Sequence, residues 1–225
     1  MSLLTDTDIE HVLCKTKTWE DSNNKLQIYP FHDDSLTPVG YDARVGGKYI
    51  SGSMPGYREL KKGEKLVLKP GEIALISTIE TIGMPKTKTI SALICSRVSC
   101  VSKGLSHIST TIDANWSGHL LIAITNHAPY RITLEYGNPF CTIVFFRNES
   151  AATRDEPSPP DRPDILMEEW KRRTHSARRK SILKLLVPPA VLIGIYLTGY
   201  HFFGNSPGLI ATTTLGVFLG SYLQK

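Results

Sequence analysis

Short runs of apolar residues recur between residues 25 and 147, and glycine- and proline-containing turns separate them. The stretch Tyr41-Asp42-Ala43-Arg44-Val45 alternates in the period-2 pattern of a half-buried strand, and Gly46-Gly47 is expected to end it. Many short strands divided by such turns predict a mainly β domain of the sandwich or barrel type. The other predicted strands are KLQIYPF at 25–31, KLVLK at 65–69, EIALISTIE at 72–80, TISALIC at 89–95, HLLIAITN at 119–126, RITLEY at 131–136 and FCTIVFF at 140–146.

Two segments of this region have a different pattern. The cap-forming cluster TDTD at 5–8 precedes Ile9, Val12 and Leu13 at helical spacing, which predicts a short N-terminal helix. Residues 52–63 are rich in glycine, proline and lysine and predict a loop.

The pattern changes after residue 147. Residues 148–163 contain four prolines and no aliphatic residue larger than alanine, which is typical of a linker. Asp164 can cap a basic helix over 164–181, before the apolar runs Ile182–Phe203 and Leu209–Leu223. These lengths predict a transmembrane helical hairpin over 182–225, and a buried core hairpin is the other interpretation. The predicted parts are a β domain at 1–147, a Pro-rich linker at 148–163, a juxtamembrane helix at 164–181 and the hairpin at 182–225.

The charge distribution supports this division into a β domain and a separate tail. Residues 1–163 carry 18 Lys+Arg and 18 Asp+Glu, so the whole net charge of +5 lies in the tail. A neutral β domain argues against nucleic acid as a partner. Lys171–Lys180 is a basic run directly before the first apolar segment, and the positive-inside rule then places the β domain in the cytoplasm. We therefore expect a multi-pass protein of the inner (cytoplasmic) membrane.

No metal site is expected from the cysteine pattern. The four cysteines contain no CxxC pair and are interpreted as reduced cytosolic thiols. The histidines are scattered, and His107 and His119 are interpreted as ordinary strand residues.

The best candidate for a ligand site is the stretch Ser96–Asn126, SRVSCVSKGLSHISTTIDANWSGHLLIAITN. Polar groups on turns between strands are how a rigid β scaffold presents a binding site. Arg97 suits an oxyanion such as phosphate, and a surface ion pair is its other interpretation. Asp113 is either a ligand contact or a turn residue that bonds its own backbone. Trp116 is either a stacking platform or an aromatic residue of the core or of an interface.

Four blocks of the sequence carry a family resemblance. TDTDI at 5–9, KLQIYPFHDDSLTPVGYDARVGG at 25–47, SRVSCVSKGLS at 96–106 and TTIDANWSGHLLIAITN at 110–126 resemble, in the same order, the dCTP deaminase and dUTPase superfamily. The resemblance implies a distorted β jelly roll that assembles as a homotrimer or a higher homo-oligomer, with each nucleotide site shared between protomers. It implies no zinc, and magnesium only where a nucleoside triphosphate is bound.

The resemblance also implies roles for individual residues. Arg97 and Ser99 match the phosphate-binding block, and Lys103 follows in the same segment. Asp113 matches the aspartate that contacts the deoxyribose or orders the attacking water in dUTPases. Trp116 matches the aromatic residue that packs on the sugar. The implied nucleotide-binding residues are Arg97, Ser99, Lys103, Asp113 and Trp116.

The departures from the family pattern concern catalysis. Val98, Ser102 and Ala123 stand where the deaminases have a catalytic serine, a second arginine and the proton-shuttling glutamate. One missing general acid or base costs about 10²–10⁴ in rate, so the chain is expected to be a pseudoenzyme for deamination. Asp113 is the one remaining candidate for a catalytic residue. Against the dUTPase pattern, Thr142 replaces a phosphate-contacting glutamine, and no Gly-rich arm follows before the linker.

Three hypotheses stay open. The first is a membrane-anchored, catalytically inactive nucleotide sensor that couples ligand binding to the hairpin, with a bacterial antiviral effector as its setting. The second is a membrane-tethered, dUTPase-like pyrophosphatase that uses Asp113. The third is a non-binding trimeric scaffold or protein-interaction module for the hairpin.

Overall fold

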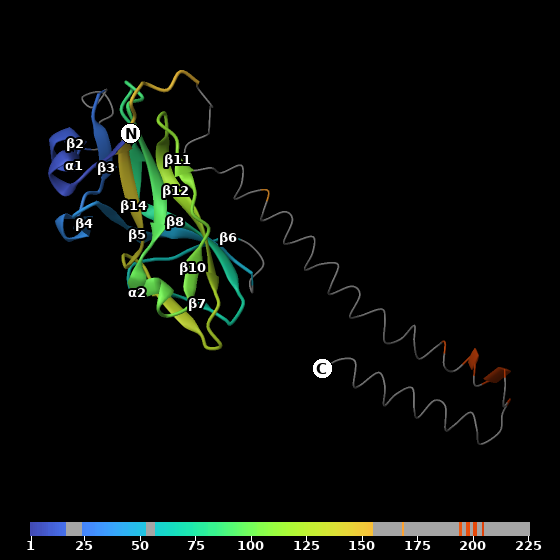
Figure 1. The fold of residues 1–225 in the computed structure, drawn as a ribbon. Coiled ribbons are helices and arrows are strands. Elements are labelled where there is room, and N and C mark those ends of the chain that lie inside the picture. The colour runs from blue at the N-terminus through green and yellow to red at the C-terminus, as the bar shows by residue number, and fades with distance from the viewer. Residues whose placement is uncertain are drawn as a thin grey trace. The chain divides into compact units, whose positions relative to one another are not determined.

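The computed structural model describes residues 1–16, 24–52 and 57–154, together with the isolated residues 168, 194, 197, 198, 200, 201 and 204. The chain divides into two units, Met1–Trp170 and Lys171–Lys225, and the first contains the β domain (Figure 1). Among the described residues, no helix is both long and apolar enough to span a bilayer. Apart from the isolated positions, the predicted helix at 164–181 and hairpin at 182–225 lie outside the described residues and stay predictions.

The first unit is mainly β, as the strand pattern predicts. Twelve strands form one large sheet, whose main path runs β10-β12-β8-β5-β14-β9-β11, and β13 pairs with β7 in a separate sheet. In the described part of this unit, two short α-helices and one 3-10 turn lie between the strands. The elements in chain order are β1 (Ser2–Leu3), α1 (Asp6–Val12), β2 (Leu13–Cys14), β3 (Leu26–Tyr29), η1 (Asp33–Ser35), β4 (Leu36–Thr37), β5 (Gly40–Ser51), β6 (Tyr57–Glu59), β7 (Lys65–Leu68), β8 (Ile73–Gly83), β9 (Ile90–Ser96), α2 (Val98–Val101), β10 (Leu105–His107), β11 (Thr111–Ile112), β12 (Ser117–Asn126), β13 (Ile132–Glu135) and β14 (Pro139–Arg147).

Strand β5 connects the two halves of the large sheet. It pairs with β14 through its first residues and with β8 from Val45 onward, with a register shift between Val45 and Tyr49. A Cβ atom on Gly46 would lie 2.4 Å from the carbonyl oxygen of Thr78, so only glycine fits this approach. The prediction that Gly46-Gly47 ends the strand is therefore wrong, because the strand continues through a bulge to Ser51. The predicted loop at 52–63 likewise contains strand β6.

Alternation along the strands sorts the side chains between the core and an outer face. In β12, Leu120, Ile122 and Ile124 are buried, whereas Leu121 and Ala123 are only partly covered. Strand β8 runs antiparallel beside it and places Leu75 opposite Ala123 and Ile73 opposite Thr125. The result is a continuous, partly exposed apolar strip on the outer face of the β8–β12 pair, made of Ile73, Leu75, Leu121 and Ala123.

A buried ion pair joins β5 to β8. The carboxylate of Glu80 is fully buried and lies 2.5 Å from Nε of Arg44, and it also accepts the backbone N–H of Arg44 at 3.0 Å. The Arg44 guanidinium donates in addition to the carbonyl of Pro30 at 3.1 Å. Breaking such a pair by removing one partner costs about 3–5 kcal/mol, because it leaves an unpaired buried charge. Glu80 therefore holds the sheet junction and the segment before η1 in one arrangement.

The N-terminal helix is confirmed together with its cap. The Thr5 hydroxyl accepts the backbone N–H of Asp8, and the Asp8 carboxylate accepts the backbone N–H of Thr5 at 3.0 Å, which is a capping box. Ile9 then packs into the core with no exposed surface. The helix is thus fixed both by its own cap and by one buried anchor.

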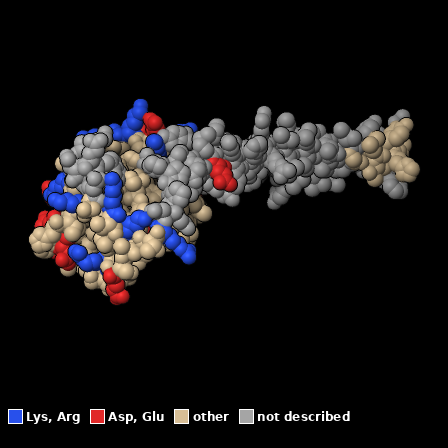
Figure 2. All heavy atoms as spheres, turned by 90° about the horizontal axis from the view of Figure 1, so that it is seen from above, with Lys and Arg blue, Asp and Glu red and all other residues tan. Residues whose placement is uncertain are grey.

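Charged side chains of both signs lie around the β domain. Figure 2 shows Lys and Arg interspersed with Asp and Glu on the face seen from above. This arrangement agrees with the equal numbers of basic and acidic residues before residue 164.

Candidate functional site

Arg97 stands at the end of β9 and directly before α2. Its Nε lies 2.8 Å from Oδ2 of Asp42 on β5, and its guanidinium also donates to the carbonyl of Pro139 on β14 at 3.1 Å. The Arg97 side chain is 26% exposed and that of Asp42 is 10% exposed. Asp42 accepts in addition the hydroxyl of Thr142 at 2.6 Å. Within one chain, the positive charge of Arg97 is therefore already paired, and an incoming anion competes with Asp42.

The other residues of the predicted phosphate block are exposed. Ser99 lies on α2 and Lys103 in the turn that follows, where the Tyr130 hydroxyl donates to the Lys103 carbonyl at 3.2 Å. Val98, which the resemblance matches to the deaminase serine, is 83% exposed. This segment thus brings Arg97, Ser99 and Lys103 to one surface, and the side chain at position 98 adds only an aliphatic group to it.

Asp113 and Trp116 share a turn between β11 and β12. The Trp116 backbone N–H donates to the Asp113 carbonyl at 2.9 Å, and the indole Nε1–H donates to the Gly118 carbonyl at 3.3 Å. The Trp116 ring is partly buried against the core, while Asp113 is exposed. The indole N–H is used within the turn, so a ligand can meet only the ring and not this donor.

The two halves of the predicted site lie far apart in one chain. Strand β11 pairs with the first part of β9, with Ile112 opposite Ala92 and Thr111 opposite Leu93. Asp113 therefore stands near Ser91, six residues before Arg97, which corresponds to about 20 Å at about 3.3 Å per strand residue. Figure 1 accordingly shows β11 and α2 towards opposite ends of the β domain. The structure does not bring Asp113 and Trp116 to Arg97 within a single chain.

Ala123, which the resemblance matches to the glutamate of the deaminases, lies on the outer face of β12. The positions that surround it on this face carry no ionisable side chain. They are Leu75 opposite, Leu121 and Thr125 along the strand, and Ser106 on β10 opposite Thr125. No carboxylate, imidazole or amine at these neighbouring positions takes over the proton-transfer role.

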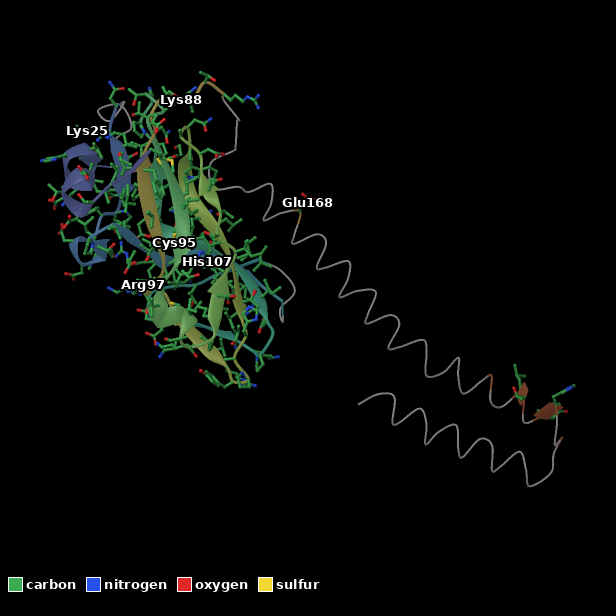
Figure 3. The ribbon with its side chains drawn as sticks, viewed as in Figure 1. Lys25, Lys88, Cys95, Arg97, His107 and Glu168 are labelled. Carbon is green, nitrogen blue, oxygen red and sulfur yellow. The ribbon has the colours of Figure 1, made fainter. Side chains whose placement is uncertain are left out.

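The sequence patterns missed a serine–histidine contact beside Arg97. Ser96 Oγ and His107 Nδ1 are 3.1 Å apart, and His107 Nε2 lies 3.3 Å from the carbonyl oxygen of Ile94. Because a carbonyl only accepts, Nε2 carries the proton of the neutral ring and Nδ1 accepts the Ser96 hydroxyl. Figure 3 shows Cys95, Arg97 and His107 gathered near the end of β9. An isolated histidine in a short strand gives no sequence signal of such a contact.

Cys141 lies one residue from Thr142 on β14 and is fully buried. Burial, and then the neighbouring carboxylates of Glu80 and Asp42, raise the pKa of the Cys141 thiol well above its usual value. The thiol therefore stays protonated at neutral pH and is a poor nucleophile. Among the described residues, no group of three or more His, Cys, Asp or Glu side chains is arranged to hold a metal ion.

The chain matches known proteins over this β domain. Residues 12–148 match the family model described as dCTP deaminase-like. The chain is 34% identical over 126 residues to the dCTP deaminase of Pyrococcus horikoshii. The matched segment covers 56% of this chain and 78% of that protein. It is 33% identical over 129 residues to the dCTP deaminase of Thermococcus kodakarensis, and this matched segment covers 57% of this chain and 80% of that protein.

Solved structures show the fold likeness. The 2'-deoxycytidine 5'-triphosphate deaminase from Agrobacterium tumefaciens superposes with a TM-score of 0.50 at 18% identity. The superposition covers 64% of this chain and 47% of that chain. At this identity the likeness concerns the fold alone.

Exchanging Asp42 for asparagine tests the competition for Arg97. The Asp42→Asn side chain keeps its shape and its contact with Thr142 but loses its charge. We expect inorganic tripolyphosphate to bind about fivefold more tightly, since one unit charge at about 4 Å in water is worth about 1 kcal/mol. Isothermal titration calorimetry at low salt measures this gain.

Two controls complete the experiment. Asp34→Asn removes an acid whose side chain is 95% exposed and should change nothing. In the double variant Asp42→Asn/Arg97→Ala the gain should vanish. Equal or weaker binding by Asp42→Asn would mean that Asp42 positions Arg97 for the anion instead of competing with it.

Proposed function

Because the chain belongs to the dCTP deaminase-like family, we propose that its β domain binds a nucleotide without deaminating it. The observation that carries the proposal is the uncharged strip of sheet around Ala123, the position that the resemblance matches to the carboxylate of the family's chemistry. Val98 and Ser102 support it, since both are exposed and neither supplies a general acid or base at neutral pH. The proposed chain is a nucleotide-binding pseudoenzyme.

The remaining groups favour binding over chemistry. Arg97 can exchange Asp42 for a phosphate, and Ser99 and Lys103 lie exposed on the same segment. Trp116 offers a ring face held by its own turn, and Asp113 offers an exposed carboxylate beside it. These residues are the proposed nucleotide contacts, with magnesium present only where it accompanies a triphosphate.

Assembly of several copies would complete the site. Arg97 and Asp113 are about 20 Å apart along β9, which is further than a sugar lies from its own phosphates. A second copy can place its Asp113 turn beside the Arg97 segment of the first. The apolar strip on β8 and β12 gives such copies a surface to bury, because Ile73 is 49% exposed there. We therefore favour a homotrimer or a higher homo-oligomer with sites between protomers.

The C-terminal part connects this binding to a membrane in our proposal. The support is the sequence alone: two apolar runs, at 182–203 and 209–223, that follow a basic segment. The proposed location is the inner membrane, with the β domain in the cytoplasm. If nucleotide binding favours one packing of the protomers, it can bias the packing of the hairpins. A role as a bacterial antiviral effector stays a hypothesis by analogy with other sensors that act on membranes.

An alkaline carbonate wash of membranes that contain the full-length chain tests the proposed membrane anchor. The full-length chain should remain in the membrane pellet after an alkaline carbonate wash, whereas a chain ending at residue 163 should be released. Full release of the complete chain by the wash would contradict the anchor.

Nucleotide binding and turnover are tested on one sample of the full-length protein. Calorimetry should show binding of dCTP, dUTP or dTTP, while an ammonia assay with dCTP and a pyrophosphate assay with dUTP stay flat. Arg97→Ala should weaken binding about tenfold or more, the loss expected for a charge-assisted contact. Trp116→Ala should weaken binding about two- to tenfold, the loss expected for an aromatic ring contact of about 0.5–1.5 kcal/mol. The exposed Arg131, mutated to alanine, is the matched control.

Each contrary result would support a different function for this chain. Absence of binding to all three nucleotides would support the scaffold hypothesis. Ammonia release from dCTP would contradict the loss of catalysis. Pyrophosphate release that disappears in Asp113→Asn would establish the dUTPase-like function instead.

A further inference from the structure

A hollow of about 490 Å³ opens on the β domain at a place that the candidate site does not use. Strands β5, β6, β8 and β12 contribute to its walls, and none of Arg97, Ser99, Lys103, Asp113 and Trp116 lines it. Its volume falls within the range of about 300–1,000 Å³ typical of small-molecule sites. The lining residues are Gly47, Lys48, Glu59, Leu60, Lys61, Lys62, Ser77, Thr78, Ile79, His119 and Tyr136.

The lining carries an excess of positive charge. Lys48, Lys61 and Lys62 face one acid, Glu59, although the first 163 residues are neutral as a whole. None of these three ammonium groups forms an ion pair with a residue that the structure describes. The nearby Lys65, in contrast, is paired with Glu135 at 2.5 Å. Three like charges around one opening repel each other, and an anion in the opening relieves this repulsion.

The inner surface combines ordered polar groups with apolar walls. Ser77 is 6% exposed, and its oxygen accepts the backbone N–H of Lys48 at 3.0 Å, which leaves its own O–H to donate. The His119 ring is held by Nδ1, which donates to the carbonyl of Glu80 at 3.2 Å. Leu60 and Tyr136 add an apolar and an aromatic surface. A charged group fits the lysine rim, and a planar ring fits the wall behind it.

We propose that this hollow is a second ligand site, which takes a small phosphate ester with an aromatic ring, such as a mononucleotide. Phosphate is favoured over a carboxylate because three compact ammonium charges match a group of charge −2 or more. The proposal does not rest on the proposed function, since the hollow contains none of the residues proposed to bind the nucleotide at Arg97 and at the Asp113–Trp116 turn.

The test uses the full-length protein in the Arg97→Ala background, which removes the phosphate contact of the other site. ATP and inorganic tripolyphosphate are the two probes in isothermal titration calorimetry. ATP should bind more tightly than tripolyphosphate, because only ATP has a ring for the Tyr136 wall. Lys61→Ala/Lys62→Ala should weaken ATP binding about tenfold, the effect of losing about 1.4 kcal/mol of charge contacts. Lys69→Ala/Lys86→Ala, a pair of exposed lysines outside the hollow, is the matched control and should bind as the background does.

A second variant fills the hollow without changing its charge. A Cβ atom on Gly47 meets its nearest neighbours only at 3.4 Å and 4.0 Å, so Gly47→Ala should fold and bind as before. Gly47→Trp should abolish ATP binding and leave the oligomeric mass unchanged in light scattering.

Three results would overturn the proposal. The first is ATP affinity that neither Lys61→Ala/Lys62→Ala nor Gly47→Trp changes. The second is equal affinity for ATP and tripolyphosphate, which would show recognition of charge without the ring. The third is a loss of oligomeric mass in Gly47→Trp, which would make the hollow a contact between copies.

Discussion

The length of strand β9 is the constraint on which the rest of this account depends. Its pairing with β11 fixes the Asp113 turn near Ser91, and its pairing with β14 fixes Arg97 beside Pro139. Neither end can approach the other while both ladders persist, because a strand has little freedom to shorten. In the proposed assembly, the residues that resemble a nucleotide site therefore form one site where two chains meet. In that proposal ligand binding and assembly would be linked, and either one would stabilise the other.

The chemistry left at these positions favours holding a ligand over transforming it. Asp42 and Thr142 keep Arg97 in place when no anion is present, and exchange of one partner for another is a binding event without bond cleavage. Around Ala123 the sheet presents aliphatic and hydroxyl groups, which cannot exchange protons with a pyrimidine ring at neutral pH. Under the proposed function the protein would act through a change of conformation or assembly, which would be transmitted to the proposed membrane hairpin.

The patterns that are local in sequence predicted the structure well. Period-2 alternation gave the mainly β domain, and the TDTD cluster gave the capped helix α1. The patterns failed where contacts between distant segments decide. Gly46 is required by the approach of Thr78 and does not end its strand, and the partner of Arg97 is Asp42, which no spacing rule connects to it. The resemblance gave candidate site residues, but it could not give the distance between Asp113 and Arg97 within one chain, which is about 20 Å at about 3.3 Å per strand residue.

Complementation between two inactive chains tests the central claim most directly. Chains with Arg97→Ala and chains with Trp116→Ala each lack one half of the site, so oligomers of either alone should bind nucleotide poorly. When the two are co-expressed and purified as mixed oligomers, about one quarter of the interfaces should regain both intact halves if chains mix at random in a closed ring. Calorimetric recovery of that fraction of tight sites is the predicted result. Mixed oligomers that bind no better than either parent would contradict a site shared between copies.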